Sequence, residues 1–137
     1  MVSDLPVIYK NFENFLKQQG CILLEKELSE SFGDLCILYS TGDILIRIVQ
    51  DRNQMGILLG NRFYTYRDTA RINYIHLSEI YKYISRNDST FDPNYYDMIC
   101  RDGYFETNYI INNWNALFEI CHDKKFHEYF KSCKQVK

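Results

Sequence analysis

Carboxylates and aromatic rings alternate between positions 92 and 106, and this segment is the strongest candidate for a recognition site. Only Arg101 carries a positive charge there, so the acidic residues outnumber the basic ones. Exposed carboxylates attract a basic partner, and tyrosine supplies a large contact area at low entropy cost. The pattern predicts a protein-binding surface formed by Asp92, Tyr95, Tyr96, Asp97, Asp102, Tyr104 and Glu106. The alternative is a solvated loop whose acids pair with the arginines found between residues 44 and 74.

Residues that could bind a metal or act as a catalytic pair do not have the spacing that such sites need. His122 and His127 would lie about 140° apart on a helix, so they would not share a face. The five cysteines contain no Cys-x-x-Cys pair. Their odd number and apolar surroundings favour free thiols in a reducing compartment, with a disulfide left open. Asp123-Lys124-Lys125 has the Asp-x-Lys spacing of some nucleases, but it lies where a helix cap is expected. We therefore predict no catalytic residue, no metal site and no cofactor.

The element that must position these side chains is an antiparallel meander at residues 35–60. Gly42-Asp43 suits a two-residue hairpin, because glycine accepts the positive φ that such turns need. Residues 51–54 form a polar break before the third apolar run. In the middle run, Ile44, Ile46 and Ile48 alternate with Leu45, Arg47 and Val49. The isoleucines should therefore face the core, while Arg47 either extends to solvent or pairs with a carboxylate.

Helices and an edge strand should surround the meander. Apolar residues recur at helical spacing between an expected cap at Asp4 and a terminating Gly20. Residues 21–28 then predict an edge strand, and residues 63–66 predict a further short strand. One face of the edge strand is expected to carry Ile22, Leu24, Lys26 and Leu28.

The C-terminal half should be helical. Residues 73–86 predict a helix, whereas residues 95–105 fit either a helical turn or a loop over the sheet. Thr107 is expected to cap the strongest helix, and Asp123 a last short one. The buried face of the strongest helix would comprise Ile110, Ile111, Trp114, Leu117, Phe118 and Cys121. Together the patterns predict a single α+β domain over residues 1–137: an antiparallel β-meander of three to five strands packed against an N-terminal helix and C-terminal helices.

The composition is that of a globular chain, with 46% hydrophobic and 25% charged residues among 137. The net charge of −2 is too small to imply a nucleic-acid binder. No apolar run approaches the roughly 20 residues of a membrane span, and the N-terminus lacks a signal-peptide pattern. We therefore expect a cytoplasmic protein that binds neither nucleic acid nor membrane. The 16% aromatic content reflects either a tyrosine-rich binding surface or the codon bias of an A+T-rich genome.

The stretch from Ile44 to Gly60 resembles a pattern that is common in small bacterial immunity-type proteins. In that pattern a strand ending in Leu-Arg-Ile/Val is followed by an Asp-Arg-x-Gln turn and a strand ending in glycine. The corresponding residues here are the strand Ile44-Leu-Ile-Arg-Ile-Val, the turn Asp51-Arg52-Asn53-Gln54 and Gly60. Such proteins accompany polymorphic toxins, including those of contact-dependent growth inhibition, and neutralise a cognate toxin by binding it. The resemblance implies that Asp51 and Arg52 belong to the scaffold.

The resemblance further implies a non-enzymatic immunity protein whose partner is the C-terminal domain of a cognate toxin, for example a nuclease. The segment at residues 92–106 would occlude the toxin's active site, with carboxylates meeting a basic cleft. Two alternatives remain open. One is a dimeric secretion chaperone for an effector, since such chaperones are also small and acidic; the other is a small hydrolase or nuclease.

Overall fold

The computed structural model describes residues 6–29, 34–51, 54–65 and 71–132, and these form an antiparallel sheet with helices before and after it. The five-stranded sheet has the strand order β1-β2-β3-β4-β5. Its strands are β1 (Ile22–Ser29), β2 (Asp34–Thr41), β3 (Ile44–Asp51), β4 (Gln54–Asn61) and β5 (Ile75–His76). The helices are α1 (Val7–Gln18), α2 (Leu77–Asn87), α3 (Pro93–Arg101), α4 (Gly103–Asn112), α5 (Trp114–Ile120) and α6 (Lys124–Ser132). The expected α+β fold is confirmed.

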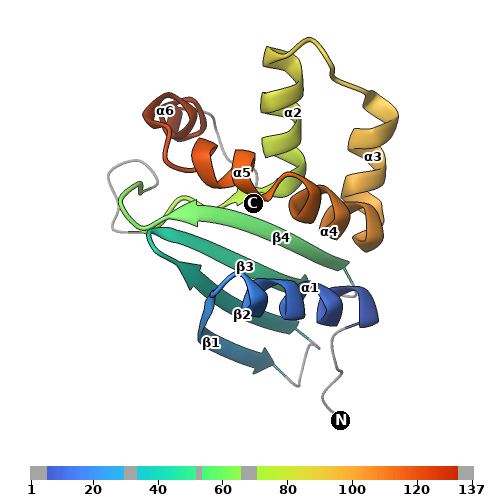
Figure 1. The fold of residues 1–137 in the computed structure, drawn as a ribbon, viewed down its shortest axis with the longest axis vertical. Helices are drawn as coiled ribbons and strands as arrows, with labels where there is room; N and C mark the ends of the chain where they lie inside the picture. Colours follow the sequence, from blue (N-terminus) through green and yellow to red (C-terminus); the bar gives the residue numbers. More distant parts are fainter. Residues whose placement is uncertain (1–5, 30–33, 52–53, 66–70, 133–137) are drawn as a thin grey trace.

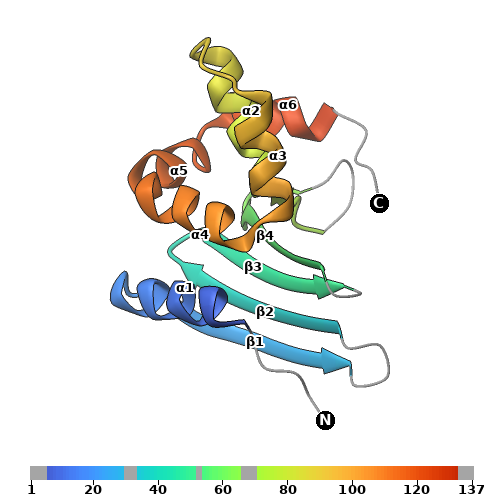
Figure 2. The ribbon, with the colours of Figure 1, turned by 90° about the vertical axis from the view of Figure 1, so that its right-hand side faces the viewer.

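Helices α1 and α4 lie on the same face of the sheet, whereas α2, α3 and α6 stand beyond its β4–β5 edge (Figures 1 and 2). The core fills the space between this face and the helices. Phe12 and Leu16 of α1 are fully buried there against the isoleucines of β3, and Ile57 of β4 is equally buried. Helix α3 packs chiefly on α2 and α4. Its position therefore depends on those two helices more than on the sheet.

The middle of the meander forms as its alternation predicts. Ile44, Ile46 and Ile48 are buried, and Thr41 pairs with Ile44 across the two-residue turn in which Gly42 has φ +60°. Arg47 on the opposite face is half-buried, and among the described side chains it does not pair with a carboxylate. Its Nε donates a hydrogen bond to Cys36 Sγ at 3.3 Å, and its guanidinium carbon lies 4.9 Å from the centroid of the Tyr74 ring. A cation–π contact thus takes the place of a carboxylate.

Strand β1 is an edge strand as predicted, but the faces assigned to its side chains were wrong. The register shifts between Leu23 and Glu25, so that Leu24 is an extra residue in a β-bulge. Leu23 lies opposite Tyr39, and Lys26 lies opposite Ile37, which puts both on the core side of the sheet. Ile22 consequently points to the other face, and the predicted grouping of Ile22 and Leu24 with Lys26 does not form.

The helix expected at residues 73–86 begins later, because Ile75 and His76 first extend the sheet as β5. The segment left open at residues 95–105 is helical, and it contributes to both α3 and α4. Thr107 is not a cap. Asp102 caps α4 by accepting a hydrogen bond from the Tyr104 N–H at 2.9 Å, while the Thr107 hydroxyl bonds to the Gly103 carbonyl within the helix.

The long helix predicted after residue 107 is broken at Asn113 into α4 and α5. The Asn113 side-chain amide donates a hydrogen bond to the Tyr109 carbonyl at 2.8 Å, which satisfies a carbonyl at the end of α4. Because the break changes the direction of the chain, Phe118 of α5 is exposed and Trp114 is half-buried, whereas Leu117 is buried as expected. The predictions for Asp4, residues 52–53, Tyr66 and Cys133 concern positions outside the described residues.

Helix α1 packs closely on the start of α4 through Tyr9 and Gly103. A Cβ atom at Gly103 would lie 2.8 Å from Cε2 of the Tyr9 ring and 2.9 Å from its hydroxyl oxygen. Glycine is required here for close approach, since a side chain would push the tyrosine ring away from the helix.

We predict that Gly103→Ala destabilises the protein by about 1–3 kcal/mol, because the methyl group overpacks the contact with Tyr9. Gly56→Ala is the matched control, because no atom lies within 4 Å of its Cβ position. The control should change stability by less than about 0.5 kcal/mol. Urea unfolding of both variants measures the difference, and equal midpoints would contradict the close packing described here.

Candidate functional site

A groove of about 950 Å³ crosses one edge of β4 and is the candidate site. Arg47 and Leu58 line it from the sheet, and Met55 lines it from the strand edge. His76 at the start of α2 borders it, as does the corner between α3 and α4 at residues 99–103. The corner carries part of the segment that the sequence singled out, so the groove brings that segment beside the meander.

Glu106 lies at the inner wall of this groove and joins three elements. Its side chain is only 6% exposed. Oε1 accepts a hydrogen bond from the Tyr9 hydroxyl of α1 at 2.6 Å, and Oε2 accepts one from the Ile57 backbone N–H of β4 at 2.8 Å. Because Glu106 itself belongs to α4, the carboxyl group connects helix, helix and sheet at one point.

Burial dominates the protonation of this carboxyl group. Removal from water raises the pKa of Glu106 to about 7, although the hydrogen bonds from Tyr9 and Ile57 favour the ionised form and act in the opposite direction. Burial, followed by the neighbouring Glu106, also raises the pKa of Tyr9. Near neutral pH the Glu106 carboxyl group is therefore partly protonated, and it is a proton-exchanging group inside the fold.

The predicted aspartates are held at the surface by local interactions. Asp92 caps α3 by accepting a hydrogen bond from the Asn94 N–H at 2.9 Å, and Asp102 caps α4 in the same way. Asp97 forms an ion pair with Arg101 one helical turn later. Asp92 and Asp97 are exposed, and Asp102 is partly exposed. The three carboxylates are spread along α3, with Asp92 at its start, Asp97 within it and Asp102 at the α3–α4 corner.

The predicted aromatic residues separate into packed and exposed ones. Tyr95 contacts the rings of Tyr81, Phe105 and Tyr109, with centroids 5.1–6.2 Å apart. The Tyr96 hydroxyl donates a hydrogen bond to Glu79 at 2.6 Å. Both rings help to attach α3 to α2 and α4. Tyr104 is 58% exposed and is the one predicted aromatic residue that projects mainly into solvent.

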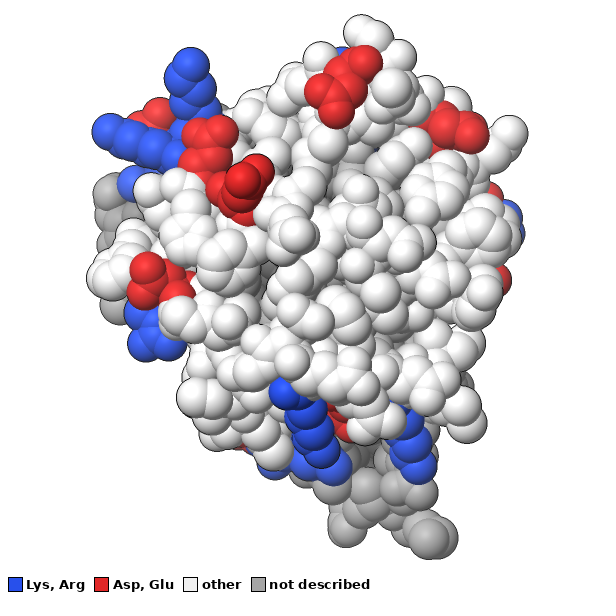
Figure 3. Space-filling model, in the orientation of Figure 1, with Lys and Arg blue, Asp and Glu red and all other residues white. Residues whose placement is uncertain are grey.

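Charged groups are sparse over the face formed by α1, α4 and α5, and they gather at its margins (Figure 3). Over residues 103–120, only Glu106 and Glu119 carry charge, and Glu106 is buried. Tyr104 begins this stretch and the partly exposed Phe118 lies near its end. Residues 103–120 therefore carry few charges and two exposed aromatic rings, a composition found at the centres of many protein interfaces.

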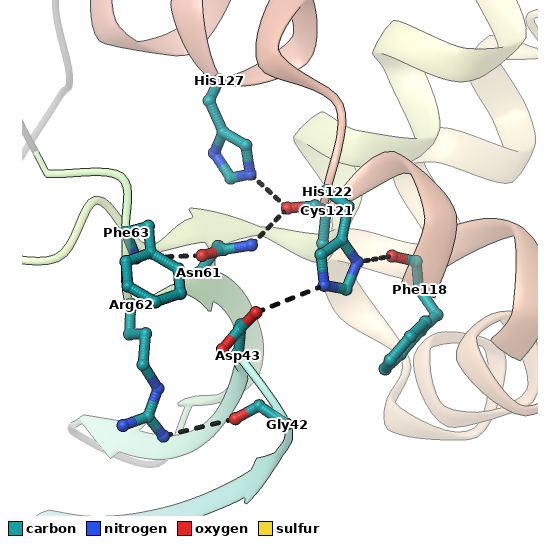
Figure 4. A network of polar contacts seen from close by, with 9 residues as sticks. All are labelled: Gly42, Asp43, Asn61, Arg62, Phe63, Phe118, Cys121, His122 and His127. Atoms are coloured by element: carbon teal, nitrogen blue, oxygen red, sulfur yellow. Dashed lines mark hydrogen bonds and ion pairs between the residues drawn. The ribbon is translucent and has the colours of Figure 1, made fainter.

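A second polar network ties the β2–β3 hairpin and the end of β4 to the C-terminal helices (Figure 4). The Cys121 carbonyl accepts hydrogen bonds from Asn61 Nδ2 at 3.0 Å and from His127 Nε2 at 2.6 Å. His122 Nε2 lies 4.0 Å from Asp43 Oδ2. The His127 ring is buried against Tyr64 with centroids 4.1 Å apart, and burial lowers the pKa of this histidine. His122 thus connects the end of α5 with the β2–β3 hairpin, and His127 connects α6 with Cys121 and Tyr64.

The sequence placed Glu106 on a binding surface and did not anticipate its contacts. One signal was present: Glu106 stands four residues before the buried Ile110, so the two share a helical face. Its two hydrogen-bond donors leave no local signal, because they lie 97 and 49 residues away along the chain and one of them is a backbone group.

The described residues form no cluster of metal-binding side chains and no disulfide among the cysteines that they include. No three His, Cys, Asp or Glu side chains among the described residues gather in a way that could hold a metal ion. Cys21, Cys36, Cys100 and Cys121 are free thiols. None of the helices in the described part of the chain has the length and apolar character needed to cross a membrane.

Comparison with known proteins identifies no relative: no family model, no curated protein and no solved structure matches the chain.

We predict that Glu106→Gln flattens the dependence of stability on pH. Since burial raises the pKa of Glu106 in the folded state to about 7 from its ordinary value of 4.5, the folded state keeps a proton that the unfolded state releases between these two pH values. Wild-type stability from this group is full below pH 4.5 and is lost as the pH rises through 7, by about 3 kcal/mol in total. Glutamine keeps both hydrogen bonds, because its amide oxygen accepts from Ile57 and its NH₂ donates to Tyr9.

Urea unfolding between pH 4 and 8 tests this prediction, with the exposed Glu128→Gln as control. The stability difference between Glu106→Gln and wild type should grow in favour of the variant as the pH rises, whereas the control should follow wild type. A parallel pH profile for Glu106→Gln would show that the carboxyl group titrates normally.

Proposed function

We propose that this protein is an immunity-type inhibitor that binds the C-terminal domain of a cognate toxin in the cytoplasm and covers its active site. The observation that carries the proposal is the exposed surface of α3 and the start of α4, along which Asp92, Asp97 and Asp102 present carboxylates and Tyr104 is exposed. The resemblance of residues 44–60 to immunity-type proteins supports the same function, because β4 in this range binds α4 through the hydrogen bond from the Ile57 N–H to Glu106.

The corner is rigid, which lowers the entropic cost of binding. Asp92 and Asp102 are fixed by the backbone N–H groups that they cap. Beneath them, Tyr95 and Tyr96 are held by ring contacts and by the hydrogen bond to Glu79. Little conformational freedom is therefore lost when a partner covers this surface.

The charges suit a basic partner. Between residues 88 and 104 there are four aspartates and one arginine, and the arginine is already paired with Asp97. A cleft that binds nucleic acid is lined by positive charge, so the corner would be drawn toward it and would compete with the substrate. The uncharged face of α4 and α5 adjoins the corner and would supply contact area with little desolvation cost.

We predict that this protein relieves the toxicity of its partner. The tagged protein is first used to capture the partner from its native host, and the captured domain is then expressed in a test strain alone or together with this protein. Growth arrest by the domain alone and recovery on co-expression are expected. A captured partner that is harmless, or an arrest that persists on co-expression, would overturn the proposal.

We also predict that the triple variant Asp92→Asn, Asp97→Asn, Asp102→Asn weakens the complex at least tenfold, mainly through slower association. Asparagine retains the capping hydrogen bonds, so charge is removed while the helices remain intact. The control is the triple variant Glu25→Gln, Glu27→Gln, Asp123→Asn. It removes three exposed negative charges away from α3, and one of them, Asp123, is also a capping aspartate. Biolayer interferometry measures both rates, and equal rates for the two variants would reject this surface.

A further inference from the structure

Half of strand β4 lacks a neighbouring strand on one side. β5 pairs only with Leu58 and Leu59, after which the chain turns into α2 at Leu77. Within the described residues, the rest of the β4 edge, from Gln54 to Ile57, faces the groove. An antiparallel segment continuing the line of β5 would lie along this edge.

The direction of the backbone groups follows from one hydrogen bond. The Ile57 N–H donates to Glu106, so it points away from β3. Alternate residues of a strand direct their N–H and C=O groups to the same side, and Met55 therefore also points to the open side. Glu106 satisfies the Ile57 N–H, but the Met55 N–H and C=O have no hydrogen-bond partner among the described residues.

The other edge of the sheet is protected against strand addition, and the β4 edge is not. β1 carries a bulge at Leu24 and three consecutive charged residues, Glu25, Lys26 and Glu27. Bulges and edge charges are the usual means by which sheets avoid pairing with another chain. Residues 54–57 are uncharged and follow the β3 register without a shift, and Gly56 has no side chain to obstruct an approaching backbone.

The groove has the size and lining for an extended segment. Its volume of about 950 Å³ is near the upper end of the range of ligand pockets, about 300–1,000 Å³. Side chains of an added strand would alternate between two sides. On one side they would meet Val49 and Leu58, and on the other they would meet Ile99 at the α3–α4 corner.

We propose that the open edge of β4 binds an extended, mainly apolar segment of another protein, which adds a strand beside Met55 in line with β5. The backbone groups of Met55 give the segment its anchoring hydrogen bonds, and Val49, Leu58 and Ile99 in the mixed lining of the groove contact its apolar side chains. Asp102 of the α3–α4 corner also lines this groove, whereas Asp92 and Asp97 do not. The inference does not depend on the proposed toxin partner.

The experiment uses random linear nine-residue peptides displayed on phage and selected on the full-length protein. Enriched peptides with alternating apolar residues are expected. Synthetic copies should then shift the ¹⁵N–¹H signal of Met55 and slow the hydrogen exchange of its amide at least tenfold. Selection of no peptide, or of peptides that leave the Met55 amide unchanged, would overturn the proposal.

A pair of proline variants sharpens the test. Met55→Pro removes the N–H on the open side of β4, and binding should fall at least tenfold. Lys26→Pro is the control, because the same alternation directs the Lys26 N–H to the open side of β1. Proline is tolerated where an edge N–H faces outward. Equal loss in both variants would contradict the proposal.

The same protein and peptides also resolve two further cases, a variant that does not fold and a protein that dimerises. If Met55→Pro fails to fold, the hydrogen exchange of the wild-type Met55 amide with and without peptide decides the question. If the unliganded protein forms a dimer in which the Met55 amide is protected, the occupant is a second copy of this chain and the proposal is wrong.

Discussion

The buried carboxyl group of Glu106 is the constraint on which the arrangement of this protein depends. Without it, the Ile57 N–H at the edge of the sheet and the Tyr9 hydroxyl would both lose a partner inside the protein. A buried unpaired donor costs about 1–3 kcal/mol, and a buried charge is also costly. The structure balances these costs with one carboxyl group that accepts both hydrogen bonds and is partly protonated at neutral pH. Because Glu106 lies in the first turn of α4, the balance also determines where the α3–α4 corner sits.

The Glu106 carboxyl group explains why the sheet can end in a fifth strand of only two residues. A complete fifth strand would satisfy the whole edge of β4, but β5 contributes only two residues before α2 begins. A helix-borne carboxylate replaces one of the missing strand's hydrogen-bond acceptors. The space that a longer β5 would have filled becomes the groove, bounded by the start of α2 and by the corner. A groove therefore takes the place of the missing part of β5, and it lies beside the α3–α4 corner that carries Asp102.

Patterns of short period predicted most of the fold. The two-residue turn at Gly42-Asp43 and the buried isoleucines of β3 follow from local conformation and alternation. The bulge at Leu24 leaves no local signal, because an extra residue in a strand changes the faces without changing the residue types. Thr107 and Asp102 are both good capping residues, and the choice between them depended on packing of Tyr9 against Gly103. Glu106 was assigned to the surface because charged side chains are seldom buried, and its partners are distant in the chain. The partly buried rings of Tyr95 and Tyr96 follow from the same packing of α3 on its neighbours.

The capping role of Asp92 and Asp102 has a consequence for how the surface can evolve. Each residue carries a negative charge outward and holds a helix start through an oxygen that accepts a backbone hydrogen bond. A single-base change converts an aspartate codon to an asparagine codon, which removes the charge and keeps the acceptor. Serine and threonine would also preserve the cap. Substitutions at these two positions can therefore change the charge of the surface at both ends of α3 without loss of the helix caps.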